Sequence, residues 1–160
     1  MDETHSQAHP EAQPSSEPSD ALETLNELLR GEMSAIETYR QALDVVEDGE
    51  GAEVLRVLRV DHRDAADVLW HHVEAHGGQP SEGSGAWGAF AKAVEGAARL
   101  LGNRAALKAL KEGEEHGLRK YEEALSGGGL PLDCELLIRE TLLLRQRGHL
   151  PVLDRLIEGN

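Results

Sequence analysis

Two glutamates and two histidines stand out because each occupies an inward position in an otherwise apolar helical stripe. Glu32 and Glu114 each lie where apolar residues recur every three or four positions. A carboxylate in apolar surroundings is costly unless a partner compensates its charge. Carboxylate and imidazole together are typical ligands of iron, manganese or zinc. The sequence therefore predicts a candidate metal site made of Glu32, His62, Glu114 and His149.

The four residues belong to an internal repeat. Segment 31–39 recurs as 113–121, with Gly-Glu at its start and Tyr at its end, at an offset of 82 residues, and flanking leucines keep that offset. Segment 62–69 recurs as 149–156 at an offset of 87, matching at His, Asp and Leu. The second half thus repeats the first, one helix pair for another. We expect the five additional residues in a longer Gly-rich turn before the fourth helix.

Apolar periodicity predicts the helices that must position these residues. The first helix is expected to begin at an N-cap at Ser19 or Asp20 and to end at the turn 48–51. The other helices are expected at about 53–76, at 89–125 with a break or kink at 102–103, and from 131–133 onward, with a kink at Pro151.

The connection 77–88 is rich in Gly, Ser and Pro. Fully extended, it would cover roughly 40 Å, the length of a helix in such a bundle. A crossover of that length lets the third helix run parallel to the second.

Composition limits the class of protein. Residues 1–19 hold three prolines and almost nothing apolar, which predicts a disordered acidic tail before a single bundle at 20–158. The net charge of −14 argues against nucleic acid and anionic membranes as partners. The single cysteine excludes an internal disulfide and a cysteine-rich zinc site. With no signal-like segment and no membrane-spanning apolar run, the predicted compartment is the cytoplasm.

The pattern Leu25-Asn26-x-x-Leu29-x-x-Glu32-x-x-Ala35-Ile36-x-x-Tyr39 resembles the first helix of bacterioferritins and related ferritin-like proteins, the rubrerythrin-like ones included. The Gly-Glu-x6-Tyr repeat and the Gly-Gly-x-Pro loop are similar to an uncharacterised bacterial family of ferritin-like bundles. Over residues 20–158 the resemblance implies an all-α, ferritin-like four-helix bundle, built from two repeated helix pairs with a long crossover between helices two and three.

The resemblance also implies a di-iron carboxylate centre, in which two helices each give a Glu and two each give Glu-x-x-His. Carried over by position, Glu32 and Glu114 match the single glutamates, and His62 and His149 match the histidines. Both bridging glutamates are missing: Arg59 and Gln146 stand in their places.

Two interpretations follow from this departure. A degenerate centre could bind iron or another divalent metal such as manganese or zinc, with Asp61 or Asp64 as alternative ligands. In the other interpretation no metal binds, because Arg59 pairs with Glu32 or Glu114 and fills the site as part of a buried structural network. Whether the protein is an enzyme is left open by both.

Two further features concern partners. His72 and His76 share a helical face and could bind a metal weakly, although a helix C-terminus also favours histidine through its dipole, which is the interpretation we prefer. Trp70, Trp87 and Phe90 are candidates for the contact of a homodimer.

Overall fold

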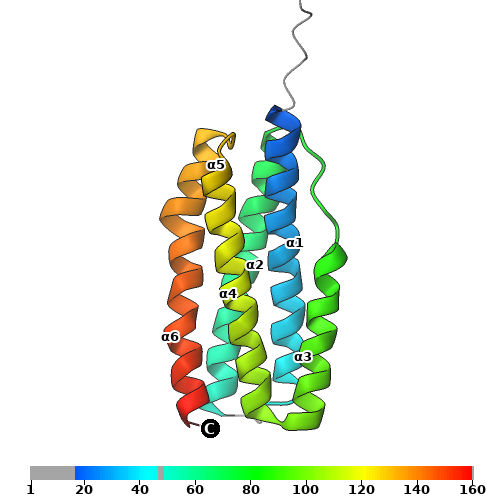
Figure 1. Ribbon diagram of the computed structural model, residues 1–160, viewed down its shortest axis with the longest axis vertical. Helices are drawn as coiled ribbons and strands as arrows, with labels where there is room; N and C mark the ends of the chain where they lie inside the picture. Colours follow the sequence, from blue (N-terminus) through cyan, green and yellow to red (C-terminus); the bar gives the residue numbers. More distant parts are fainter. Residues whose placement is uncertain (1–16, 47–48, 160) are drawn as a thin grey trace, which may run out of the picture.

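The computed structural model describes residues 17–46 and 49–159, and every regular element among them is helical (Figure 1). The bundle consists of α1 (Glu17–Leu43), α2 (Glu50–Ala75), α4 (Asn103–Gly127) and a composite fourth helix. That fourth helix comprises α5 (Leu132–Leu137), the π-helical turn η2 (Ile138–Leu142) and α6 (Leu143–Gly159). The predicted all-α four-helix architecture is confirmed.

A long crossover separates the two helix pairs. After α2 the chain passes along the outside of the bundle, forms η1 (Gly85–Trp87) and α3 (Gly88–Leu101), and reverses at Gly102 into α4 (Figure 1). Gly102 has a φ of 82°, a left-handed conformation that glycine adopts without steric cost. As predicted, α4 runs parallel to α2. The break at 102–103 is a complete reversal, so α3 is part of the crossover and not part of the third bundle helix.

The first helix begins earlier than predicted. Its first residue is Glu17, so the expected N-cap residues, Ser19 and Asp20, lie inside the helix. Pro18 is compatible with a first helical turn because the backbone N–H that proline lacks would have no helical partner there. The rest of the segment predicted as a tail, 1–16, lies outside the described residues.

The core is divided into two apolar clusters. One cluster contains Leu25, Leu69 and Ile138, and the other contains Leu55 and Leu107 together with their neighbours. The repeated Glu and His positions fall between these clusters along each helix. The apolar stripes therefore bring the polar residues to the middle of the bundle.

The fourth helix corrects one expectation from the repeat. Residues 128–131 separate α4 from α5, whereas 44–49 separate α1 from α2, so the extra residues do not lengthen the turn. They extend the start of the fourth helix: at the offset of 87 the first residue of α2, Glu50, corresponds to Leu137, and α5 begins five residues earlier, at Leu132. The turn itself is tight because Gly128 and Gly129 both adopt positive φ angles, 70° and 78°. The helix α6 continues through Pro151, and the irregular turn of this helix lies earlier, at η2.

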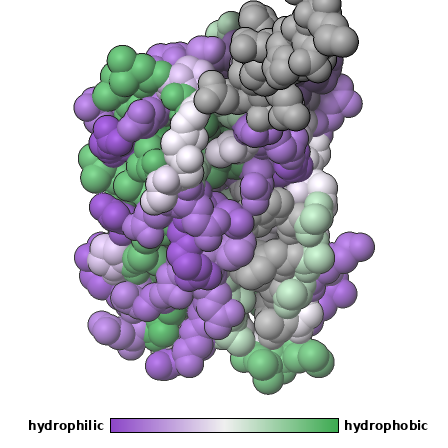
Figure 2. Space-filling view, turned by 45° about the horizontal axis from the view of Figure 1, so that its top comes forward, coloured by the Kyte–Doolittle hydropathy of each residue, from purple (hydrophilic) through white to green (hydrophobic). Residues whose placement is uncertain are grey.

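The surface bears on the predicted homodimer contact. The face in Figure 2 is largely hydrophilic, with separate apolar areas. Trp70 is partly buried against the core, and the side chains of Trp87 and Phe90 lie outside the described ones. Homodimerisation stays a prediction. Among the described residues, no helix combines the length and the apolar character needed to cross a bilayer.

Candidate metal centre

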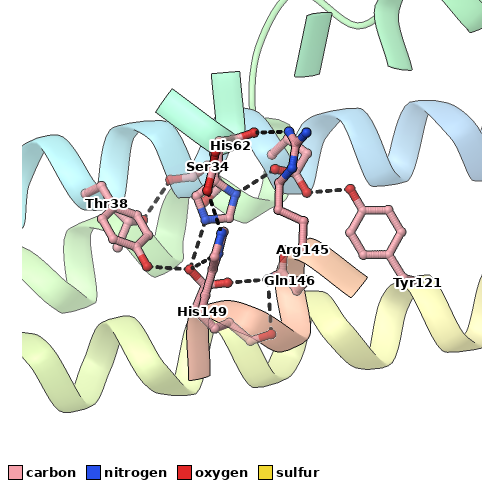
Figure 3. A network of polar contacts seen from close by, with 11 residues as sticks. Ser34, Thr38, His62, Tyr121, Arg145, Gln146 and His149 are labelled. Carbon is pink, nitrogen blue, oxygen red and sulfur yellow. Dashed lines mark hydrogen bonds and ion pairs between the residues drawn. The ribbon is translucent and has the colours of Figure 1, made fainter. Parts of the chain in front are cut away.

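The structure brings all four predicted residues together at the middle of the bundle. Glu32 comes from α1, His62 from α2, Glu114 from α4 and His149 from α6, and each is at most 5% exposed. Their positions follow from the stripes described above, because each residue occupies the inward position between two apolar turns. Figure 3 shows the resulting polar network.

His62 lies between the two carboxylates. Its Nδ1 is 2.7 Å from Glu32 Oε2, and its Nε2 is 2.9 Å from Glu114 Oε1. Burial alone lowers the pKa of an imidazole, but the negative charges of Glu32 and Glu114 outweigh it and raise the pKa of His62 to about 10. Without a metal, His62 is therefore an imidazolium at neutral pH that holds α1 and α4 together through α2.

Glu114 is the most heavily contacted of the four. Its Oε1 accepts a hydrogen bond from the hydroxyl of Tyr39. The same oxygen faces both His62 Nε2 and His149 Nδ1, the latter at 3.1 Å. Its Oε2 accepts a hydrogen bond of 2.5 Å from Gln146 Nε2. Burial raises the pKa of the carboxyl, but the charge of His62 and the hydrogen bonds from both histidines lower it to about 2. Glu114 is thus held ionised.

The second ring nitrogen of each histidine contacts another carboxylate. For His62 this partner is Glu32, and for His149 it is Asp61, whose Oδ2 lies 3.2 Å from Nε2. Asp61 is therefore a partner of a histidine. Asp64 is exposed, and among the described residues it does not belong to the group of potential ligands around Glu114.

The two tyrosines pair across the repeat. Tyr121 donates to Glu32 Oε1 at 2.5 Å, and Tyr39 donates to Glu114, so each hydroxyl bonds the carboxylate of the other half. Burial, followed by the adjacent carboxylate charge, raises the pKa of both phenols well above its usual value. The repeat gives each Glu a Tyr seven residues later in the same helix, but it does not predict the crossed pairing. The crossing arises because α1 and α4 are antiparallel (Figure 1).

Arg59 does not fill the site. Its Nε donates to the backbone carbonyl of Ile36 at 3.2 Å, and the guanidinium is partly exposed. Within the described part of the chain, Arg59 forms no ion pair with Glu32 or Glu114; His62 occupies the position between them. The expectation that Arg59 pairs with these glutamates is wrong, because the long side chain keeps its charge hydrated by leaving the core.

Gln146 is the functional neighbour that the sequence did not identify. From the sequence it is only the residue that stands where a bridging glutamate is missing; in the structure it is 5% exposed and donates to both the side chain and the backbone carbonyl of Glu114. Gly117 makes room for it, since a Cβ at that position would lie 2.7 Å from Gln146 Nε2. The signal available in the sequence was the spacing of three residues before His149.

A cavity of about 40 Å³ reaches this network between α1 and α4. Its lining includes the two glutamates, His62 and both tyrosines. The volume is sufficient for a water molecule, which needs about 10–15 Å³ measured in this way. Within the described residues, the only buried side-chain oxygen or nitrogen without a hydrogen-bond partner is Gln41 Oε1, which is not among the lining residues.

The fold is similar to that of a solved structure described as ferritin like, diiron-carboxylate proteins from Bacillus anthracis str. Ames. The two chains are 22% identical, with a TM-score of 0.71, and the match covers 90% of this chain and 99% of that one. This likeness confirms the ferritin-like fold that the sequence resemblance implied.

No curated protein matches the chain. Residues 20–127 match a family model described as a domain of unknown function, DUF2383. Because this match covers well over half of the 160 residues, the chain belongs to the DUF2383 family.

Proposed function

We propose that this protein binds one divalent metal ion, iron or else manganese or zinc, through His62, Glu114 and His149. The observation that carries the proposal is the convergence of His62 Nε2 and His149 Nδ1 on Glu114 Oε1. The potential ligand atoms of these three buried residues all lie within 4.8 Å of one another. Two imidazoles and one carboxylate form a ligand set that leaves further positions open for exogenous ligands.

The surroundings of the histidines support the same proposal. Histidines that bind metals usually donate their second N–H to a carboxylate, which fixes the ring orientation and increases ligand basicity. Glu32 has this relation to His62, and Asp61 has it to His149. In this proposal the role of Glu32, which the sequence suggested as a direct ligand, is to orient His62.

A di-iron centre does not fit the residues present. Bridging carboxylates are needed where Arg59 and Gln146 stand, and Arg59 contacts a backbone carbonyl of α1. Gln146 presents an amide N–H toward Glu114, which is a donor and not a ligand. The proposal is therefore a mononuclear site. A bound iron ion would supply redox chemistry, whereas zinc would supply Lewis acidity.

A second candidate is a structural network that binds no metal. It is favoured by the position of the His62 imidazolium, which contacts Glu32 and Glu114 at once, so that each carboxylate has an ion-pair partner. Such a network would fix the register of the helices, because the four polar groups meet in only one arrangement.

The deciding experiment measures bound metal. The full chain is stripped with a chelator and titrated anaerobically with Fe(II), Mn(II) or Zn(II), in parallel with Glu114→Gln and the control Glu115→Gln. Glu115 is the next residue along α4, and its side chain is 45% exposed. We expect Glu114→Gln to lose one equivalent of metal and Glu115→Gln to bind as the parent does.

Two results would contradict the proposal. If Glu114→Gln binds as many metal ions per chain as the parent does, the metal lies at another site. A parent that binds no metal at all would support the structural network. Circular dichroism of each variant establishes that the helical fold is retained.

A further inference from the structure

A second group of metal-ligating side chains lies at the end of the bundle where α2 ends and α5 begins. His72, in the last turn of α2, and His76, the residue that follows this helix, face Asp133 and Cys134 at the start of α5. The ligand atoms of all four lie within 4.8 Å of one another. None of these residues belongs to the buried network at the middle of the bundle.

Asp133 lies between the two imidazoles. Its Oδ2 is 3.2 Å from His72 Nδ1 and 2.9 Å from His76 Nε2. The Cys134 Sγ is 3.4 Å from the same His72 Nδ1. Two nitrogens, one carboxylate oxygen and one sulfur thus point toward a common centre from two segments that are distant in sequence.

These separations match those of a closed tetrahedral site. With Zn–N and Zn–O bonds of about 2.0–2.2 Å and a Zn–S bond of about 2.3 Å, neighbouring ligand atoms lie about 3.3–3.7 Å apart. The three distances given above, 3.2, 2.9 and 3.4 Å, are within a few tenths of an ångström of that range. An ionised aspartate and thiolate would also neutralise a divalent cation, while neutral imidazoles complete the set.

We propose that His72, His76, Asp133 and Cys134 bind a zinc ion, or a similar thiophilic divalent cation, that fastens the start of the fourth helix to the end of the second. Cys134 is fully buried and packs in the apolar cluster, whereas the side chains of His76 and Asp133 are 31% and 55% exposed. The sulfur is thus fixed by the core and the other ligands are open to solvent, so an ion can enter from outside. The negative end of the α2 dipole adds a favourable term for a cation.

The contacts made by His72 and His76 favour metal binding more than their spacing in the sequence does. From the i, i+4 spacing alone, His72 and His76 were better explained by the helix dipole. Their contacts with Asp133 and Cys134, which are about 60 residues further along the chain, supply the two additional ligands that the histidines lacked.

Cobalt(II) tests the proposal because a cobalt–thiolate bond gives a charge-transfer absorption that imidazole and carboxylate do not. One equivalent of Co(II), added to the reduced and metal-free full chain, is expected to produce this band and to be displaced by Zn(II). Cys134→Ser should lack the band. His76→Gln, at a side chain that is 31% exposed, should weaken Zn(II) binding more than about a hundredfold, since losing only an outer partner costs 10–100-fold. Circular dichroism of this variant establishes that the helical fold is retained.

The controls separate this site from the central one. His71→Ala, on the same turn of α2, should bind as the parent does, because within the described part of the chain the side chain of His71 bonds the Asp67 carbonyl and none of the four proposed ligands. Glu114→Gln should retain the charge-transfer band even if it loses metal from the buried centre. Absence of the band in the parent would overturn the proposal, as would a His76→Gln variant whose affinity for Zn(II) equals that of the parent.

Discussion

At the scale of single residues, the buried network assigns different roles to residues that look equivalent in the sequence. Glu32 and Glu114 occupy matching positions of the repeat, yet only Glu114 faces both histidines. Glu32 contacts His62 and Tyr121. The asymmetry originates in the fourth helix, where His149 turns its second nitrogen toward Asp61 and away from Glu32.

This asymmetry predicts unequal effects of two matched substitutions. Glu114→Gln removes a ligand and should abolish binding at the central site. Glu32→Gln removes only the partner that orients His62 and should weaken binding about 10–100-fold. Titration of the stripped proteins with Fe(II) or Zn(II) measures both affinities. Equal losses in the two variants would instead make Glu32 a direct ligand.

Gln146→Glu tests the position of the missing carboxylate. The new carboxylate would lie against Glu114 Oε2, where the amide now donates at 2.5 Å. Repulsion between two buried like charges should lower the melting temperature of the metal-free protein, and a bound cation should restore it. Thermal melts with chelator and with added metal measure both effects. A variant as stable as the parent without metal would contradict this account of Gln146.

At the scale of elements, the close approach of α4 and α6 depends on a small residue. Gly117 lies within a helix, where glycine is normally unfavourable, and its missing Cβ is what allows Gln146 to reach Glu114. The adjoining irregular turn η2 precedes Gln146 in the same helix, and both of its terminal residues, Ile138 and Leu142, are buried. The π-helical turn therefore changes which side of the fourth helix the residues after it, including Gln146, face.

Gly117→Ala is therefore expected to destabilise the protein in spite of the better helix propensity of alanine. Displacing Gln146 from a packed interface should cost about 1–3 kcal/mol of unfolding free energy, the usual range for overpacking. The control is Gly96→Ala in α3, where an added Cβ meets nothing within 4 Å and should be neutral or slightly stabilising. Urea unfolding of both variants measures the difference; a stabilised Gly117→Ala would show that Gln146 relocates freely.

At the scale of the whole molecule, stability is linked to the charges at the centre of the bundle. The His62 imidazolium and the Glu114 carboxylate hold three helices together, and both are ionised only over a limited range of pH. Most of the other buried residues are apolar, and their burial does not depend on pH.

The metal-free protein should accordingly be most stable between about pH 4.5 and 6.5. The pKa of His62 is raised from 6.5 to about 10, so its contribution is complete below 6.5 and is lost as the pH rises through 10. The pKa of Glu114 is lowered from 4.5 to about 2, so its contribution is complete above 4.5 and is lost as the pH falls through 2.

Unfolding free energies measured from pH 3 to 10 in the presence of a chelator test this profile. His62→Gln should lose the decline in stability above pH 6.5. It should also weaken the decline on the acid side, because the charge of His62 is the main cause that lowers the pKa of Glu114. If the parent and His62→Gln declined in parallel above pH 6.5, the charge of His62 would not be a source of stability.

The sequence by itself determined the helical class, the repeat and the inward positions of Glu32, His62, Glu114 and His149. These features depend on the spacing of apolar residues along one helix and on the cost of burying a charge, and both can be evaluated without knowing the neighbouring helices.

Only the tertiary structure decided which partners those residues meet. Four contacts depend on the relative heights and rotations of separate helices. They are the crossed hydrogen bonds of the two tyrosines, the bond of Arg59 to the backbone of α1, the contact of Asp61 with His149, and the contact of His76 with Asp133. A periodic pattern specifies which face of a helix is buried, but it contains no information about the position of one helix along another. That position is set by the packing of the whole bundle.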